Sequence, residues 1–202
     1  MATIKYAQDQ LKELLLQALE TERGGIQVYT HAIKAAQNDD LHKEWNEYLD
    51  QTRRHEQVLL GVFEELGLDP DERSPGRDVV KHLGEGLVQA IRAAIDNATP
   101  EAAELVAGEC VVLAETKDHL NWELIGHVVK HGSGPATKVL KRAFDEVEED
   151  EDHHLYHTAG WTRELWIKSL GFPAVLPPPE EVRNVDTAIG ASRAEQQRSK
   201  ML

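Results

Sequence analysis

The segments ERGGIQVY (residues 22–29) and ETKDHLNW (residues 115–122) each place an aromatic residue seven positions after a glutamate. Each segment lies in a long helical pattern. The pattern that follows contains a histidine at the end of TRRH (residues 52–55) or EDHH (residues 151–154). Four-helix bundles can hold a pair of metal ions in their core with one inward glutamate from each of two helices and an E-x-x-H-type segment from each of the other two. The repeat therefore predicts a helical fold with a buried metal site.

Apolar residues at 3.6-residue spacing predict four long helices, over residues of about 8–37, 41–67, 101–131 and 137–170. A shorter helix over residues of about 78–97 lies between the second and third of them. Short turns within each pair predict antiparallel hairpins. We therefore expect an all-α fold, an antiparallel four-helix bundle of two helical hairpins joined by a long crossover that carries a short extra helix.

The end of the chain has a different composition. Three successive prolines at positions 177–179 precede a polar, charged segment. This composition is typical of an extended arm or a disordered segment. We expect residues 1–172 to form the bundle and residues 173–202 to form an extended or disordered C-terminal tail.

Composition and charge narrow the classes of partner. The chain has 202 residues and a formal net charge of −14, which argues against nucleic acids and anionic membranes as partners. The start of the sequence lacks the pattern of a secretion signal, and Cys110 is the single cysteine. We expect a cytoplasmic protein with neither a disulfide nor a cysteine-rich metal module.

The helical faces and levels indicate which polar side chains point inward. Glu22 lies in the middle of the apolar stripe on the first helix. Burying a carboxylate there costs free energy unless it is paired or bound to a metal. Glu151 and His154 flank the middle of the apolar stripe on the fourth helix. In an antiparallel hairpin, two residues that lie equally many positions before and after the turn are at the same height. This predicts that Glu22 faces His55, and that Glu115 faces Glu151 and His154.

The third long helix has two apolar stripes, and each contains a glutamate. The face alone favours Glu109, whereas the level and the repeated Glu-to-aromatic spacing favour Glu115. We prefer Glu115 and keep Glu109 as the alternative. A helix that is apolar on two sides also predicts contact with the short extra helix or with a second subunit. We expect a homo-oligomer, for example a dimer.

The pattern resembles the ferritin-like di-iron carboxylate superfamily, in the wide sense that includes rubrerythrin-type domains, here without a rubredoxin module. The resemblance covers residues of about 8–170, apart from the extra helix. It implies two bound iron ions, with manganese or zinc as other possibilities, since carboxylates and imidazoles suit all three metals. The ligands that it implies are Glu22, His55, Glu115, Glu151 and His154.

Thr52 departs from the family pattern, which has a glutamate at this position. Two neighbouring side chains are candidates to replace the lost ligand: Glu56, one residue after His55, and His119, one turn after Glu115. If neither side chain replaces the lost ligand, the site holds one metal ion or none. Tyr29 and Trp122 are candidate outer-shell residues beside the ligands.

Two functions follow from these residues. The first is a metal-binding enzyme that oxidises Fe(II), or activates dioxygen or peroxide, at a dinuclear centre. Its partners would be metal ions and dioxygen or peroxide. The alternative, suggested by Thr52, is a non-enzymatic bundle with a degraded metal site that acts as a stress-related or structural interaction protein.

Overall fold

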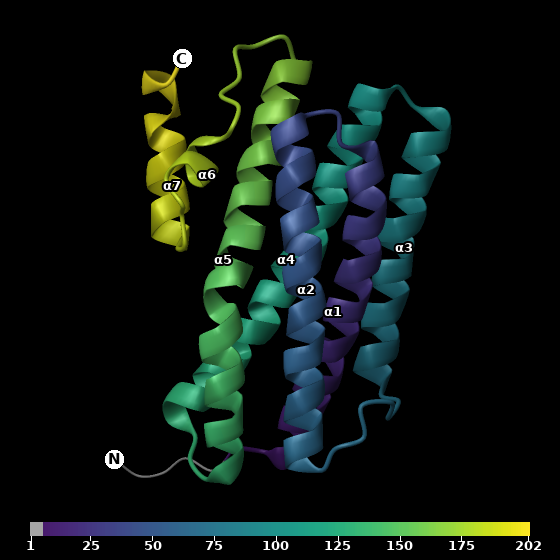
Figure 1. Ribbon diagram of the computed structural model, residues 1–202, viewed down its shortest axis with the longest axis vertical. Helices are drawn as coiled ribbons and strands as arrows, with labels where there is room; N and C mark the ends of the chain where they lie inside the picture. The colour runs from purple at the N-terminus through teal and green to yellow at the C-terminus, as the bar shows by residue number, and fades with distance from the viewer. Residues whose placement is uncertain (1–5) are drawn as a thin grey trace.

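The computed structural model describes residues 6–202, and this part of the chain is helical with no strand (Figure 1). The predicted all-α class is confirmed. The helices are α1 (Gln8–Ala35), α2 (Asp39–Leu66), α3 (Pro75–Asn97), α4 (Pro100–His131), α5 (Pro135–Ser169), α6 (Pro179–Val182) and α7 (Ala188–Gln197), followed by a 3-10 turn (Arg198–Lys200).

The ends of the long helices follow from local capping. The side chain of Asn38 accepts hydrogen bonds from two backbone N–H groups of the first turn of α2, and Gly67 ends this helix with a positive φ of 65°. Proline occupies the first turn of α3, α4 and α5, where it needs no hydrogen bond. Helices α3 and α5 therefore begin two to three residues earlier than predicted, at Pro75 and Pro135.

The five long helices lie side by side along the longest axis of the molecule (Figure 1). Helix α1 packs against α2, α3 and α4, and α5 packs against α4 and α2. Helix α3, the predicted extra helix, also packs against α4, so it covers one side of the α1–α4 pair. The predicted contact between the third long helix and the extra helix is confirmed.

Two apolar clusters form the core, one toward each end of the long helices. One contains Trp45 and Trp161, and the other contains Phe63 and Trp122. Along α1, residues 11–19 belong to the second cluster and residues 28–35 to the first. Helices α2, α4 and α5 likewise pass from one cluster to the other, so each has a short segment between the clusters. Most of the buried polar residues of these four helices lie in these segments and form a layer at mid-height.

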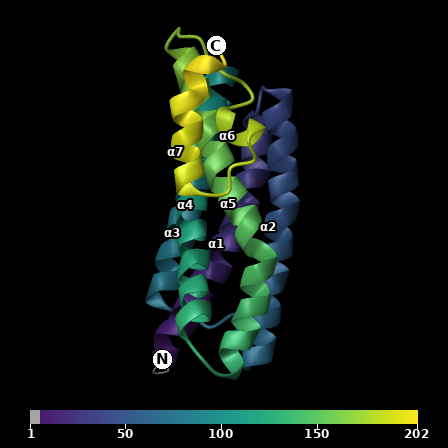
Figure 2. The ribbon, with the colours of Figure 1, turned by 90° about the vertical axis from the view of Figure 1, so that its left-hand side faces the viewer.

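The C-terminal segment differs from the prediction, because it contains α6 and α7, which pack against α5 (Figures 1 and 2). Glu164 of α5, fully buried, accepts hydrogen bonds from Arg198 Nε at 2.6 Å and from the backbone N–H of Val175 at 2.8 Å. Arg163 of α5 likewise pairs with Glu180 of α6 at 2.7 Å. These partners are distant in sequence, so the local composition gave no sign of them.

Within residues 6–202, no helix is both long enough and apolar enough to span a membrane.

Candidate metal centre

Six ionisable side chains converge in the polar layer, and each is at most 3% exposed. They come from four helices, which fixes them in position because each lies in the interior of a long helix rather than in a loop. We refer to these six residues as the inner cluster: Glu22 from α1, His55 from α2, Glu115 and Asp118 from α4, and Glu151 and His154 from α5.

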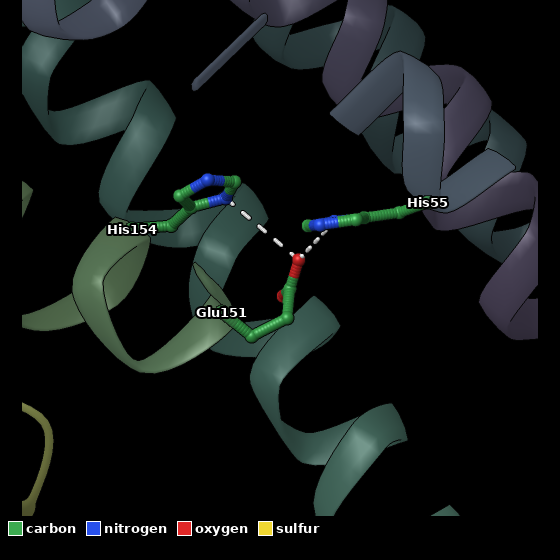
Figure 3. A group of neighbouring side chains, drawn as sticks. All are labelled: His55, Glu151 and His154. Carbon is green, nitrogen blue, oxygen red and sulfur yellow. Dashed lines mark ion pairs between the residues drawn. The ribbon is translucent and has the colours of Figure 1, made fainter. Parts of the chain in front are cut away.

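Glu151 lies between the two histidines of the inner cluster (Figure 3). Its Oε1 atom is 2.9 Å from His55 Nδ1 and 3.7 Å from His154 Nδ1. Neither contact is a hydrogen bond, because the first lacks the alignment and the second is too long, so both nitrogens have no hydrogen-bond partner among the described residues. One ligand atom from each of the three residues lies within 4.8 Å of the others, a spacing that could hold a metal ion.

Glu22, Asp118 and Glu151 form a second group of the same size, with their ligand atoms also within 4.8 Å of one another. Glu151 thus belongs to both groups. Glu115 lies beside the first group, with its Oε2 atom 3.5 Å from His154 Nδ1. The two groups could therefore hold neighbouring ions with the carboxylate of Glu151 between them.

Both histidines are oriented by partners outside the cluster. His55 Nε2 lies 3.2 Å from a carboxylate oxygen of Asp150, and His154 Nε2 lies 2.9 Å from Oε1 of Gln51. An acceptor at each Nε2 favours the tautomer with the proton on that nitrogen, which leaves a lone pair on Nδ1. Both Nδ1 atoms face Glu151, so both imidazoles present an inward lone pair, as metal-ligating histidines do.

The inner cluster has an unusual number of buried polar atoms without a hydrogen-bond partner. Buried polar groups are nearly always paired, so each exception needs an explanation. Among the described residues the unpartnered atoms of the cluster are Glu22 Oε2, His55 Nδ1, Glu115 Oε2, Asp118 Oδ1, both carboxylate oxygens of Glu151, and His154 Nδ1. All six residues contribute at least one atom, and a bound cation would pair them together.

Burial and mutual repulsion raise the pKa of three of the four carboxyl groups. Burial is the largest cause for all three, followed by a neighbouring carboxylate. The pKa of Glu151 rises from 4.5 to about 8, and the pKa values of Glu22 and Asp118 also lie well above their ordinary values. A positive charge in the centre would remove this penalty.

The two predicted outer-shell aromatic residues lie against the cluster and are buried. Trp122 Nε1 donates a hydrogen bond of 2.9 Å to Oε1 of Glu22 and so fixes the orientation of that carboxylate. The Tyr29 hydroxyl has no hydrogen-bond partner in the described part of the chain. Burial and the nearby charge of Glu115 raise the pKa of Tyr29 well above its ordinary value, so the phenol keeps its proton.

The structure brings together five side chains that the sequence predicted as ligands, and it places them at the predicted level. Glu22 Oε2 lies 3.9 Å from His55 Nδ1, and Glu115 lies beside His154 as expected. Glu109 is exposed and instead accepts a hydrogen bond from Trp166 Nε1 at 3.0 Å. The position of Glu109 therefore excludes it from the cluster and supports the choice of Glu115.

Glu56 and His119, the predicted replacement ligands, lie outside the inner cluster in this structure. Glu56 forms a 3.0 Å ion pair with Arg23, since one residue beyond His55 is a rotation of about 100° away from the layer. His119 Nε2 lies 2.8 Å from Asp152, on the outer side of α4 and α5. Thr52 is buried, and its hydroxyl donates to the backbone carbonyl of Tyr48.

Asp118 is the cluster residue that the sequence prediction missed. It lies three residues after Glu115 and four before Trp122, so all three share one face of α4. That shared face was a usable signal, but the prediction weighed only the glutamates Glu109 and Glu115 as carboxylate ligands from this helix. The outer partners Asp150 and Gln51 were also missed, because nothing in their local sequence distinguishes them from solvated residues.

Comparison with known proteins gave no match, whether with family models, with curated proteins or with solved structures. The chemistry of the centre is therefore inferred from its own residues.

Proposed function

We propose that the inner cluster binds a pair of iron or manganese ions and that the protein oxidises Fe(II), or activates dioxygen or peroxide, at this centre. In this proposal α1, α2, α4 and α5 form a four-helix bundle with ferritin-like connectivity, and α3 is the helix of its long crossover. The ligands are the six residues of the inner cluster.

Charge balance is the observation that carries the proposal. The cluster contains four carboxyl groups and two imidazoles, and the one nearby cation in the described chain that acts on them, Lys117, lies beside Asp118 with its ammonium group bound to Asn121. Four buried carboxylates without a counter-charge are too costly to remain ionised. Two divalent cations supply four positive charges, which balance four carboxylates and leave the imidazoles neutral. They would also pair the unpartnered oxygen and nitrogen atoms of the cluster.

The metal pair would supply one-electron redox chemistry and open coordination positions for dioxygen or peroxide. The protein residues have separate tasks. Glu151 would bridge the two halves of the centre, and Asp150 and Gln51 hold the imidazoles with Nδ1 inward. Trp122 holds Glu22 in position through its N–H group, and Tyr29 keeps a proton on its hydroxyl beside Glu115. The apolar clusters on either side exclude water from the layer.

A single zinc ion on His55, His154 and Glu151 is a second candidate, favoured by the two-histidine, one-carboxylate composition of that group. One zinc ion would leave two negative charges of Glu22, Glu115 and Asp118 without compensation. In the metal-free interaction protein suggested by Thr52, protons alone would neutralise these carboxyl groups. Asp118 restores the number of carboxylates to four, which favours the paired centre over both alternatives.

The test is Fe(II) oxidation in air by the purified protein and by the double variant Glu22→Gln/Glu151→Gln. We expect the variant to lose at least about tenfold in rate, because it lacks two anionic ligands. The matched control is Glu101→Gln/Glu109→Gln, which removes two exposed carboxylates from α4 and should keep the wild-type rate. Equal rates in all three proteins would refute the proposed activity.

A further inference from the structure

A cavity of about 370 Å³ lies between α4, α5 and the chain just before α7. Five carboxylates line it: Glu151 of the inner cluster, Glu123 from α4, Glu148 and Asp152 from α5, and Asp186 from the C-terminal segment. We call this cavity the acidic vestibule. Figure 2 shows the C-terminal segment lying over α4 and α5 on the side where the vestibule is formed.

We propose that the acidic vestibule is the entry route for divalent cations to the inner cluster, and that the C-terminal segment forms its outer wall. This inference rests on the proposed function, and it adds the path and the charge class of the substrate. It also gives the C-terminal segment a function, since that segment supplies Asp186.

The vestibule reaches the inner cluster through Glu151, which is one of its lining residues. The side chain of Glu151 is only 2% exposed, and both of its carboxylate oxygens are unpartnered within the described chain. A buried, unpartnered carboxylate at the inner end of a cavity is a group that a cation could bind on arrival. From there the same carboxylate belongs to both groups of the centre.

The lining charges favour cations over anions. Among the described residues that line the vestibule there is no lysine or arginine, and His119 is held by Asp152 at 2.8 Å. A cleft lined by charges of one sign concentrates counter-ions and raises their association rate by about 10- to 1,000-fold. The vestibule should therefore accelerate metal uptake more than it changes the affinity of the buried site.

A second polar cavity, of about 260 Å³, provides the comparison. It lies between α2, α5 and the C-terminal segment, and Asp40 and Glu47 are among its lining residues. Its described lining includes Lys43 but none of the six residues of the inner cluster. Like the acidic vestibule, it borders α5 and is lined by several carboxylates, but it does not reach the buried centre.

The C-terminal wall is held by contacts that do not involve the cluster. The Thr187 side chain caps α7 by accepting a hydrogen bond from the backbone of Gly190 at 3.1 Å, and Arg198 pairs with Glu164 beyond the end of α7. Asp186 is exposed and adjacent to this cap. Its charge can be removed without touching either contact, so the wall can be altered without unfolding it.

The experiment measures the rate of Co(II) binding to the metal-free protein by stopped-flow absorbance, with the final number of ions per chain determined separately. The test variant is Glu148→Gln/Asp186→Asn, which removes two exposed charges from the vestibule. At low salt we expect binding to slow by about tenfold, with an unchanged final stoichiometry. High salt should reduce the difference, because exposed charges are screened. The control is Asp40→Asn/Glu47→Gln in the second cavity, which removes the same number of charges. We expect this control to bind Co(II) at the wild-type rate.

The outcomes separate this inference from the function on which it rests. If the wild-type protein binds Co(II) and the vestibule variant binds it at the same rate, the entry route is wrong while the metal centre stands. A slowed control variant with a normal vestibule variant would assign entry to the second cavity and would also refute the inference. A wild-type protein that binds no Co(II) would overturn both proposals.

Discussion

In the proposed centre, Asp118 would supply the carboxylate that Thr52 does not. Thr52 occupies the position three residues before His55 in α2, but its hydroxyl donates a hydrogen bond to a backbone carbonyl of its own helix. Asp118 contributes a carboxylate to the same layer from α4, and its ligand atom lies within 4.8 Å of those of Glu22 and Glu151. The number of carboxylates in the layer is thus four, although one helix contributes none.

This compensation predicts the effect of Asp118→Asn on metal binding. Loss of one anionic ligand from the Glu22–Asp118–Glu151 group should reduce the bound metal from about two ions per chain to about one. Equilibrium titration with Fe(II) under anaerobic conditions measures this number. Glu109→Gln, an exposed change on the same helix, should leave it unaltered. Two tightly bound ions in Asp118→Asn would show that Asp118 is not a ligand.

The raised pKa values predict how the stability of the metal-free protein depends on pH. A carboxyl group whose pKa is raised on folding stabilises the fold while protonated, and this contribution is lost as pH rises toward the folded pKa. For Glu151 this stabilising contribution is lost progressively between about pH 4.5 and about pH 8. Thermal unfolding of the metal-free protein should therefore give a lower Tm at pH 8 than at pH 5. In Glu151→Gln the difference should shrink.

Added metal should reverse this trend, because metal ions bind the deprotonated carboxylates and compete with protons. The metal-loaded protein should have a higher Tm at pH 8 than at pH 5. A Tm of the metal-free protein that rises steadily over this range would contradict the assignment of raised pKa values to the inner cluster.

Asp150 gives a prediction for the outer partners. Asp150→Ala removes the acceptor at His55 Nε2 and should weaken metal binding by about 10- to 100-fold, with the stoichiometry preserved at saturating metal. Isothermal titration of the metal-free protein measures the affinity. Glu149→Ala, an exposed change one residue earlier, is the control. An unchanged affinity in Asp150→Ala would mean that His55 needs no orienting partner.

At the scale of the helices, periodicity and turn residues predicted the five long helices to within a few residues, because each buries a continuous apolar stripe. The level argument also placed Glu22 beside His55, since equal counts from a tight turn give equal heights. The sequence did not predict α6 and α7, since their anchors, Glu164 and Trp161, lie on α5 and become partners only in the folded chain. On α4 the apolar face alone favoured the exposed stripe that contains Leu113 and Glu109, and only the level and the repeated spacing pointed to Glu115.

The docking of α7 depends on Arg198, whose guanidinium binds the fully buried Glu164. We expect Arg198→Ala to destabilise the docked segment by about 1.5–3 kcal/mol, the usual cost of a hydrogen bond to a charged group. Hydrogen exchange should then accelerate over residues 183–202, with little change in α1 and α2. Arg193→Ala, at an exposed position on the same helix, should leave exchange unaltered. Unchanged exchange in Arg198→Ala would show that the segment is held by other contacts.

At the scale of the whole molecule, the two apolar clusters and the polar layer between them form one arrangement. The layer buries six ionisable groups in a core that would be more stable without them, unless a ligand compensates their charge. The surface is also strongly acidic, with a formal net charge of −14 for the chain. Both features favour cations, at the surface through attraction and in the layer through charge balance.

The most direct test of the paired centre is the metal content of the wild-type protein after anaerobic loading with Fe(II) and removal of loosely bound ions, measured by plasma mass spectrometry. The four carboxylates of the layer predict about two iron ions per chain, because two divalent ions balance their charge. About one ion per chain would support a single-metal site instead. No bound metal would contradict the account, and the buried layer would then be a structural feature of the helical core.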